Sequence, residues 1–452
     1  MELKEFSESG KLVTRFVESK GQLHVIQEKD VLSNAEIEKK QTQGFIRKGL
    51  EIFLPAGYPH TVSPDYLPYK IYDTLQTLSS AIAGLLANRA VLQGVGVGDA
   101  TASPTGALLL SIFQDSAGRI ATILFAHRLG SSIEPECKRY RLAADVFNDA
   151  AMIADCLSPA FPKALRIMVL CTASIMRALC GVAAGSSKAT LTAHFARSGN
   201  LGELNAKDAS QGNAISLLGM LLGSIVVSYI TSPLATWIAM LLLLTAHLSL
   251  NYAAVRAVSM QTLNRQRANI LFSNLIAHDI VLTPREVSQR ERIFESDGVL
   301  RWADDHVLGS ARIGSSFREV ARNVAAGSQK TLANASHVNL GLLKQLLDIF
   351  EDEDYVIWLD TKRSIVFIVL KREARPSSQL QAWCQALLLI SDEGSQPKAQ
   401  TASPEVILDL IAGSLTKSAK LFAQHRQHII NAGWNIDSAA LETQSSLRLV
   451  SI

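Results

Sequence analysis

One apolar run, residues 215–250, dominates the hydropathy pattern of the chain and contains no Lys, Arg, Asp or Glu. Only the short Thr231-Ser232-Pro233 sequence interrupts it. A membrane-spanning helix needs about 20 mostly apolar residues, and residues 215–232 and 234–252 each come close to that length. The pattern therefore predicts two membrane helices joined by a tight turn at Pro233.

The stretch before this run, residues 185–213, is polar and holds the residues that we predict to bind a ligand. Hydroxyl and backbone N–H groups at a helix start bind phosphate, and a lysine adds charge. We therefore expect a helix to start at Gly185-Ser186-Ser187-Lys188, and Asp208 to cap the first span. The alternative is that these cations only anchor the positive side of the membrane. The predicted ligand-binding residues are Lys188, His194, Arg197, Lys207, Asp208 and Gln211.

Three further helices are predicted upstream. Residues 74–97 form a long helix, and residues 162–184 a third candidate span with Arg177 inside it. Residues 138–157 form a helix whose polar residues recur at steps of three and four, which places them on one face. Either that face is solvated, or it lines a wet cavity in a helix bundle, where ionisable groups are costly and usually functional. The residues of this predicted polar cavity are Arg141, Asp145, Asn148 and Asp149.

The remaining features of this region concern helix packing. Residues 104–113 and 120–125 are each too short to span a bilayer, so we expect buried or re-entrant segments there. Gly219 and Gly223 lie one turn apart in the first span, a spacing that allows close contact between helices. His247 in the second span is expected to hydrogen-bond to another helix.

From residue 281 onward the composition becomes that of a soluble domain. Thr283-Pro284-Arg285-Glu286 has the hydroxyl cap, the proline and the glutamate that start a helix. Residues 355–359 and 365–370 are rich in apolar and β-branched side chains around a polar turn, which predicts a β-hairpin. Further helices are expected at 340–350, 380–389 and 404–431.

These elements predict a mainly α fold in three parts. An N-terminal extension, residues 1–52, has an expected strand at 23–26 and helix at 35–48. A multi-pass helical membrane domain follows at 53–280. The last part, 281–452, is a small C-terminal soluble α+β domain.

The composition of the chain argues against several classes of function. Charged residues make up 19% of the chain, against about 25% in a typical soluble domain. The net charge of +3 and the lack of a basic tract exclude nucleic acid as an expected partner. The five cysteines have no metal-ligand spacing, and no nucleophile–base set is visible, so we predict no catalytic residue, no metal and no enzyme. The N-terminus lacks the features of a cleaved signal.

Several motifs, in order, resemble those of the root UV-B sensitive (RUS) family, the vitamin B6 photoprotection and homeostasis domain family. The first half contributes Phe53-Leu54-Pro55-Ala56-Gly57-Tyr58-Pro59 and Lys138-Arg139-Tyr140-Arg141. The second contributes His194-Phe195-Ala196-Arg197, Ala206-Lys207-Asp208 and Thr262-Leu263-Asn264-Arg265. The resemblance implies a membrane-associated protein that acts in vitamin B6 homeostasis and UV-B sensitivity. It supplies no reaction and no catalytic residues.

Three hypotheses follow from the residues and the resemblance together. The first is an integral membrane protein of vitamin B6 homeostasis that binds an anionic small molecule such as pyridoxal phosphate. The second is a small-molecule transporter, and the third is a non-catalytic membrane scaffold that recruits a partner through its C-terminal domain. The expected partners are membrane lipid and another member of the family or a second copy of the chain.

Overall fold

The computed structural model describes most of the chain: residues 2–6, 12–19, 22–27, 54–55, 57–95, 104–197, 199–295, 297–326, 340–394, 403–438, 440–442 and 447–450. Contacts divide the chain into two compact units. The first consists of Met1–Ile123 and Arg141–Val258, and the second of Leu124–Tyr140 and Ser259–Ile452. The helix expected at 35–48 lies outside the described residues, and the domain boundaries at 53 and 281 stay predictions.

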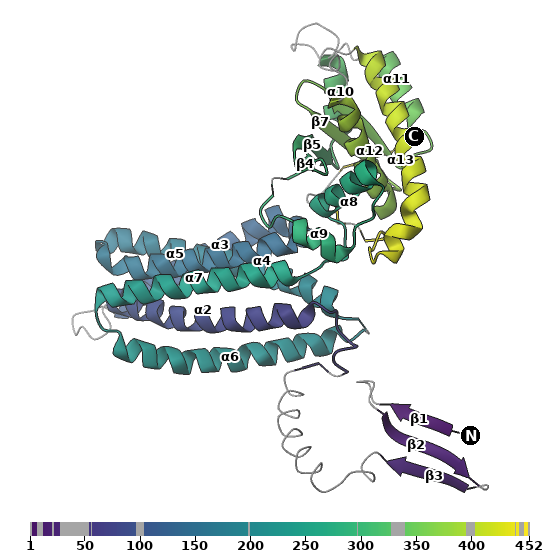
Figure 1. Ribbon diagram of the computed structural model, residues 1–452. Helices are drawn as coiled ribbons and strands as arrows, with labels where there is room; N and C mark the ends of the chain where they lie inside the picture. The colour runs from purple at the N-terminus through teal and green to yellow at the C-terminus, as the bar shows by residue number, and fades with distance from the viewer. Residues whose placement is uncertain are drawn as a thin grey trace. The chain divides into compact units, whose positions relative to one another are not determined.

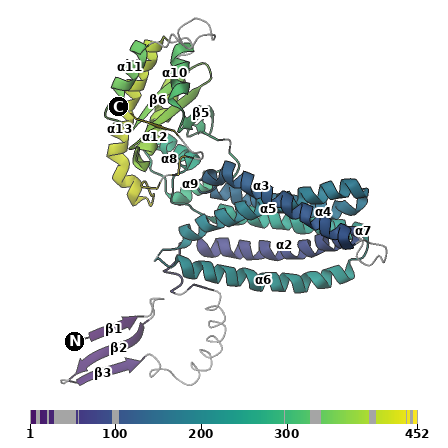
Figure 2. The same ribbon diagram turned by 180° about the vertical axis from the view of Figure 1, so that it is seen from behind.

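Long helices make up most of the first unit, and they lie side by side (Figures 1 and 2). They are α2 (Tyr66–Val95), α3 (Pro104–Ile133), α4 (Cys137–Leu157), α5 (Lys163–Phe195), α6 (Leu201–Tyr229) and α7 (Pro233–Ala257). The end of α3 and the first residues of α4 (Leu124–Tyr140) belong to the second unit. A 3-10 turn, η2 (Ser158–Ala160), joins α4 to α5. Near the N-terminus, β1 (Glu2–Phe6), β2 (Leu12–Ser19) and β3 (Gln22–Gln27) form an antiparallel sheet, and β3 contains the strand expected at 23–26.

Within the described residues, four helices are long and apolar enough to cross a membrane. They are Thr105–Ile133, Lys163–Phe195, Leu201–Tyr229 and Pro233–Ala257. The expected pair of helices around Pro233 is confirmed: Ser232 caps α7 by accepting a hydrogen bond from the Ala235 N–H at 3.2 Å. The mainly helical fold with a smaller C-terminal region of strands and helices is also confirmed.

Three sequence-based expectations about helix boundaries are wrong. Residues 104–113 and 120–125 belong to one helix, α3, because the polar residues between them continue the helix and Gly118 lets it lie against α5. No helix starts at 185–188, because α5 runs through that segment to Phe195. Asp208 is no cap, because α6 begins at Leu201, about two turns earlier. Helix backbone bonds form within the helix, so a change from apolar to polar side chains does not end one.

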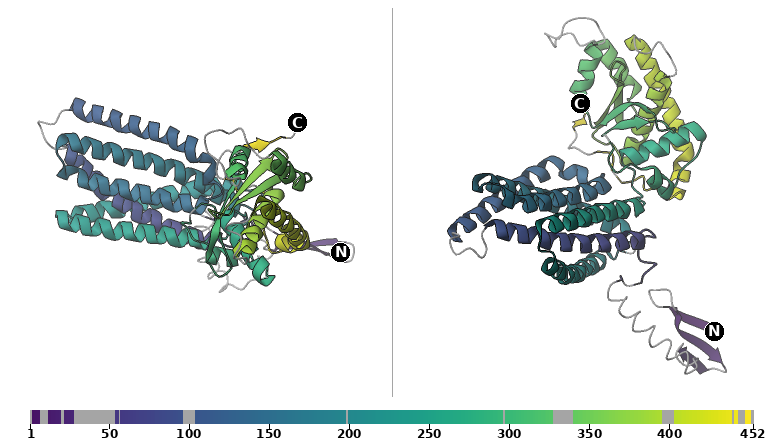
Figure 3. Two further views of the ribbon diagram at one scale, coloured as in Figure 1. Left: turned by 90° about the horizontal axis from the view of Figure 1, so that it is seen from above. Right: turned by 60° about the vertical axis from the view of Figure 1, so that its left-hand side comes forward.

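The paired glycines of α6 touch α2 as their spacing predicts. A Cβ atom at Gly219 would lie 2.5 Å from the Cβ of Ala81, and one at Gly223 would lie 2.6 Å from the Leu85 Cδ1. Only a residue without a side chain therefore permits the observed distance between α2 and α6. Figure 3 shows the helices of this bundle from two further directions.

The second unit is built around a mixed sheet. Its strands are β4 (Val299–Arg301), β5 (Val307–Ile313), β6 (Tyr355–Asp360), β7 (Ile365–Lys371) and β8 (Arg448–Leu449), in the order β4-β5-β7-β6 with β8 paired to β7. The predicted hairpin is confirmed as the antiparallel pair β6–β7. The helices are α8 (Arg265–His278), α9 (Pro284–Arg290), α10 (Phe317–Ala326), α11 (Leu340–Ile349), α12 (Pro376–Gly394) and α13 (Pro404–Asn431).

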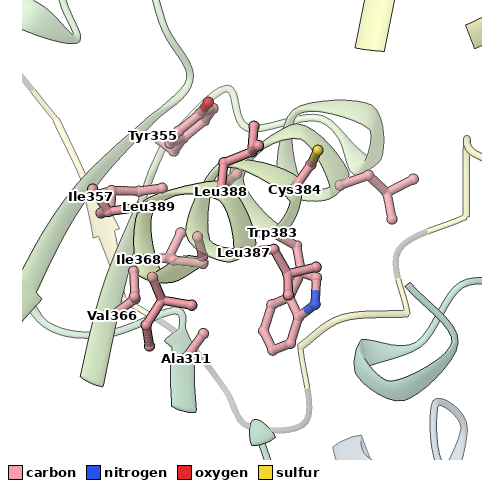
Figure 4. Close-up of a cluster of buried hydrophobic side chains, with 14 of the residues drawn as sticks. Ala311, Tyr355, Ile357, Val366, Ile368, Trp383, Cys384, Leu387, Leu388 and Leu389 are labelled. Carbon is pink, nitrogen blue, oxygen red and sulfur yellow. The ribbon is translucent and has the colours of Figure 1, made fainter. Parts of the chain in front are cut away.

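The core of this unit forms between α12 and the sheet (Figure 4). Trp383, Cys384 and Leu387 of α12 are fully buried, and Ile357 and Ile368 of the hairpin are buried with them. Such continuous apolar strands are typical of sheets with little exposure to water. The predicted helix start at Thr283 is confirmed, because Thr283 and Glu286 form a reciprocal capping box.

Candidate functional site

Charged side chains lie in the interior of the first unit, on α2, α4, α6 and α7. Asp145 and Asp149 are 5% and 3% exposed, and His247 is 1% exposed. Buried charges are costly unless they are paired. Each of these groups has a charged or polar partner on another helix, and together they form one connected set. We call this set the charged network; its members are Lys70, Asp73, Arg141, Asp145, Asp149, Lys188, Asp208 and His247.

The first half of the charged network joins α5, α6, α2 and α4. Asp208 of α6 binds two lysines, Lys188 of α5 and Lys70 of α2. Lys70 also lies 3.3 Å from Asp73, and Asp73 accepts a hydrogen bond from Arg141 of α4 at 2.9 Å. Four helices far apart in the sequence are therefore linked by alternating positive and negative groups.

The second half centres on Asp145 of α4. Its carboxylate accepts hydrogen bonds from the amides of Gln76 on α2 and Asn251 on α7. The imidazole of His247 lies 3.6 Å from the same carboxylate, and its Nδ1 lies 2.7 Å from the Oδ1 of Asp149. The expected role of His247 as a hydrogen-bond partner between helices is confirmed.

The charges of the network do not balance. It contains three basic side chains and four carboxylates, so the sum is −1 when His247 is uncharged and zero when its imidazole holds a proton. The Oδ2 of Asp149, the Oε1 of Gln76 and the Oδ1 of Asn251 are buried without a hydrogen-bond partner among the described residues. Unsatisfied acceptors of this kind favour a positive or hydrogen-bond-donating occupant.

The charged network reaches water at one end and an apolar layer at the other. Lys188 is the accessible end, with 48% of its side chain exposed. Near the middle of the 25-residue helix α7, one turn from His247, the polar groups give way to an apolar layer. The layer consists of Ala83, Leu86, Ala87, Met152, Met240 and Leu244. The polar path therefore stops about halfway through the bundle.

The predicted ligand-binding residues divide into two groups. Lys188 and Asp208 meet directly, and Gln211, one turn after Asp208, is buried on the same helix. His194 instead pairs with Asp65 at 2.9 Å. The backbone N–H of Arg197 donates to the Thr61 carbonyl, so both of these residues hold the segment before α2. Lys207 is on α6, next to Asp208.

The predicted polar-cavity residues lie on the bundle side of α4. Arg141, Asp145 and Asp149 belong to the charged network, and the Asn148 amide donates to the Ser80 hydroxyl at 3.3 Å. A further ion pair, between Arg177 and Asp155, links α5 to α4.

Sequence reasoning missed the contribution of α2. Lys70, Asp73 and Gln76 all face the network, but Lys70 and Asp73 precede the helix expected at 74–97. Their steps of three residues in a largely apolar helix were the available signal, since such a spacing puts polar groups on one face. Pro68 is compatible with α2 because it lies in the first turn, where its missing N–H leaves no bond unmade.

A small pocket lies at the accessible end of the network. Aromatic rings, two lysines and one carboxylate line it. Its volume is about 10 Å³, which holds about one water molecule. A larger ligand would enter only after Lys188 leaves Asp208, and the exposure of Lys188 permits that movement. The lining residues are Tyr66, Tyr69, Lys70, Lys188, Leu191, Thr192, Phe195, Leu204 and Asp208.

Metal and thiol chemistry find little support in the described part of the chain. No group of three or more His, Cys, Asp or Glu side chains there could hold a metal ion. All five cysteines are free, and burial raises the pKa of the Cys137 thiol to about 11 and that of Cys384 to about 12. A thiol with a raised pKa is a poor nucleophile at neutral pH.

Two family models match the chain. Residues 39–279 match the "Vitamin B6 photo-protection and homoeostasis domain", and residues 281–445 match "Root UVB sensitive protein, C-terminal". The chain is 33% identical to "Protein root UVB sensitive 3" of Arabidopsis thaliana over 346 residues, which cover 76% of this chain and 75% of that protein. It is 40% identical to "RUS family member 1" of Dictyostelium discoideum over 261 residues, or 57% of this chain and half of that protein. No solved structure matches the chain.

Proposed function

The chain belongs to the root UVB sensitive family, and from this premise we propose that its helical unit sits in a membrane and binds a small anionic ligand of vitamin B6 metabolism, such as pyridoxal phosphate. The family model names vitamin B6 homoeostasis. The observation that carries the proposal is the accessible end of the charged network, where two lysines share one carboxylate.

The surface of the helical unit supports its insertion in a membrane. The outward side chains of the four apolar helices are large and exposed, such as Ile123 at 67% and Leu242 at 67%. Soluble monomers rarely expose contiguous apolar patches larger than a few hundred Å². A lipid bilayer would cover these side chains, while the charged network stays inside the bundle.

The accessible end of the network has the chemistry for an anionic ring compound. In this half of the network Lys70, Lys188 and Arg141 carry three positive charges against the two negative charges of Asp208 and Asp73, so this end attracts an anion. Tyr66, Tyr69 and Phe195 offer ring faces, with ring centroids 5.1–5.5 Å from one another where they contact. A phosphate would replace Asp208 as the partner of Lys188, and the rings would contact the pyridine.

Binding of pyridoxal phosphate to the purified full-length protein in detergent, measured by calorimetry or fluorescence, tests this proposal. A charge-assisted hydrogen bond contributes about 1.5–3 kcal/mol, so Lys188→Met should weaken binding about tenfold or more. Lys163→Met is the matched control, because Lys163 is exposed on the same helix near its other end. No binding at millimolar ligand, or equal loss in both variants, would reject the site.

Transport of the ligand is a second candidate function. It is favoured by the charged network, which extends about halfway through the helical bundle. Ionisable groups at membrane depth usually mark substrate or ion pathways. In the structure the polar path begins at the partly exposed Lys188 and ends at the apolar layer beyond His247. Uptake of pyridoxal phosphate into proteoliposomes should fall strongly in Asp145→Asn, because this carboxylate holds Gln76 and Asn251 in place. Unchanged uptake in that variant would argue against transport.

A further inference from the structure

A cleft of about 290 Å³ lies within the second unit. Small-molecule sites usually measure about 300–1,000 Å³, so the cleft has the size for a compact ligand. Its walls are one face of α8, the chain after α9, and β4 with the turn that follows it. Nine of its thirteen lining residues are polar or charged: Gln266, Asn269, Ser273, Asn274, Arg290, Arg292, Glu295, Arg301 and Asp305.

Amide side chains of α8 hold the other two walls in place. Asn269, 3% exposed, donates to the Arg301 carbonyl at 2.9 Å and accepts from the Arg301 N–H at 3.2 Å. Gln266, with its amide oriented so that both atoms are satisfied, makes the same pair of bonds to the backbone of Arg292 at 3.0 and 3.1 Å. The walls are therefore fixed before any ligand binds, which lowers the entropic cost of binding.

The cleft carries an excess of one positive charge. Arg301 binds Glu295 through two nitrogens at 2.8 and 3.3 Å, and Arg292 pairs with Asp305. Each of these two pairs is neutral.

Arg290 is the remaining cation. Its Nη1 donates to the neutral amide oxygen of Asn274 at 2.8 Å. Glu286, one turn earlier, is the nearest acid on the same helix, and its carboxylate is held by Thr283 in the capping box. A guanidinium has five N–H donors, so Arg290 retains donors for a bidentate contact with a phosphate or carboxylate.

We propose that this cleft binds a small, flat molecule that carries one phosphate or carboxylate group. The anion contacts Arg290 and the Ser273 hydroxyl, both of which line the cleft. Trp302, which is half-buried, also lines the cleft and supplies an aromatic ring for contact with the ring of the ligand. The site is independent of the pyridoxal phosphate site at Lys188, because it lies in the other unit and shares no residue with it.

The alternative role of Arg290 is purely structural, since it ties the end of α9 to α8 through Asn274. Two variants separate the roles. Arg290→Met removes both the tie and the charge, whereas Asn274→Ala removes the tie and leaves the charge. A structural role predicts that both variants lower the unfolding temperature equally and that neither changes ligand binding.

The experiment is calorimetry on the full-length protein in detergent with phenyl phosphate, which has the ring and the anion, and with phenol and inorganic phosphate, which have one each. We expect phenyl phosphate to bind more tightly than either part. Arg290→Met should weaken its binding about tenfold or more, and Asn274→Ala, which keeps the guanidinium, should weaken it less. Arg318→Met, an exposed arginine of α10 outside the cleft, is the matched control.

Two results would overturn the site. Absence of binding at about 10 mM phenyl phosphate, in the range of very weak affinity, would do so. Binding that is lost in Lys188→Met and kept in Arg290→Met would assign the anion to the helical unit and reject the cleft. Loss of pyridoxal phosphate binding in Lys188→Met with unchanged phenyl phosphate binding would leave both proposals standing as separate sites.

Discussion

Gly219→Ala should destabilise the helical unit because it forces α6 away from α2. The added Cβ would lie 2.5 Å from the Cβ of Ala81, where ordinary contact begins at 3.4 Å. Ala81 has no flexible end that could move aside, so the two backbones must separate by about 1 Å. Overpacking of this kind costs about 1–3 kcal/mol.

Gly212→Ala is the matched control for this prediction, because a Cβ at Gly212 of the same helix meets nothing within 4 Å. Alanine is favoured over glycine in a helix by about 1 kcal/mol, and both variants receive that gain. The difference between them therefore isolates the packing cost. Gly223→Ala should fall between them, because its closest neighbour is the end of the Leu85 side chain.

Thermal unfolding of the purified protein in detergent, followed by circular dichroism at one scan rate, measures the order of the three variants. A stability change of 1 kcal/mol shifts the midpoint by about 2–4 °C in a domain of this size. Gly219→Ala should therefore unfold several degrees below Gly212→Ala. Equal midpoints for these two variants would refute the close packing of α2 on α6.

Three further predictions concern the second unit. Lys138→Met should lower the free energy of unfolding by about 3–5 kcal/mol, because it leaves the buried carboxylate of Glu291 without its closest cation. Adding Glu291→Gln should recover part of this loss, as measured by chemical unfolding. No recovery in the double variant would contradict the pairing. Burial raises the pKa of Glu136, so the folded state keeps that proton to higher pH than the unfolded chain, and stability from this group falls as pH rises above the ordinary carboxyl pKa of about 4.3. The stability of Glu136→Gln relative to the natural chain should therefore increase as pH rises above about 4.3, and a relative increase as pH falls would oppose this sign. Cys384 is fully buried with a pKa raised to about 12, so a maleimide should label it only after unfolding; mass spectrometry that finds it labelled in the folded protein would contradict the core shown in Figure 4.

Local signals predicted much of the second unit. The capping box at Thr283, the β6–β7 hairpin and α13 all appear where the sequence placed them. Each depends on residues close together in the chain, since a cap spans three residues and a hairpin turn only a few more. Residues only a few positions apart determine the backbone conformation of a cap or a hairpin turn, so these elements can be predicted from the sequence alone.

Helix ends in the first unit were harder to predict. The polar stretch 185–213 was expected to contain a new helix start and the cap of the first span, although most of it lies within α5 and α6. The polarity of a side chain depends on what surrounds the helix. Whether the helix continues depends on backbone bonds that Ser and Thr here do not break, because their hydroxyls donate to carbonyls one turn earlier, as Thr192 does to Lys188.

For the candidate site, hydropathy predicted spans within α5, α6 and α7 but not in α3, whose two apolar stretches were expected to be separate buried or re-entrant segments. The sequence also placed polar residues of α4 on one face and predicted the hydrogen bond of His247 to another helix, but it assigned Asp208 to a cap that α6 does not have. Only the tertiary structure decided how these groups pair. Lys70 meets Asp208 across 138 residues, and His247 meets Asp149 across 98. The periodicity of a helix shows which face a residue occupies, but the partner of that face depends on packing between helices, and no local pattern encodes it.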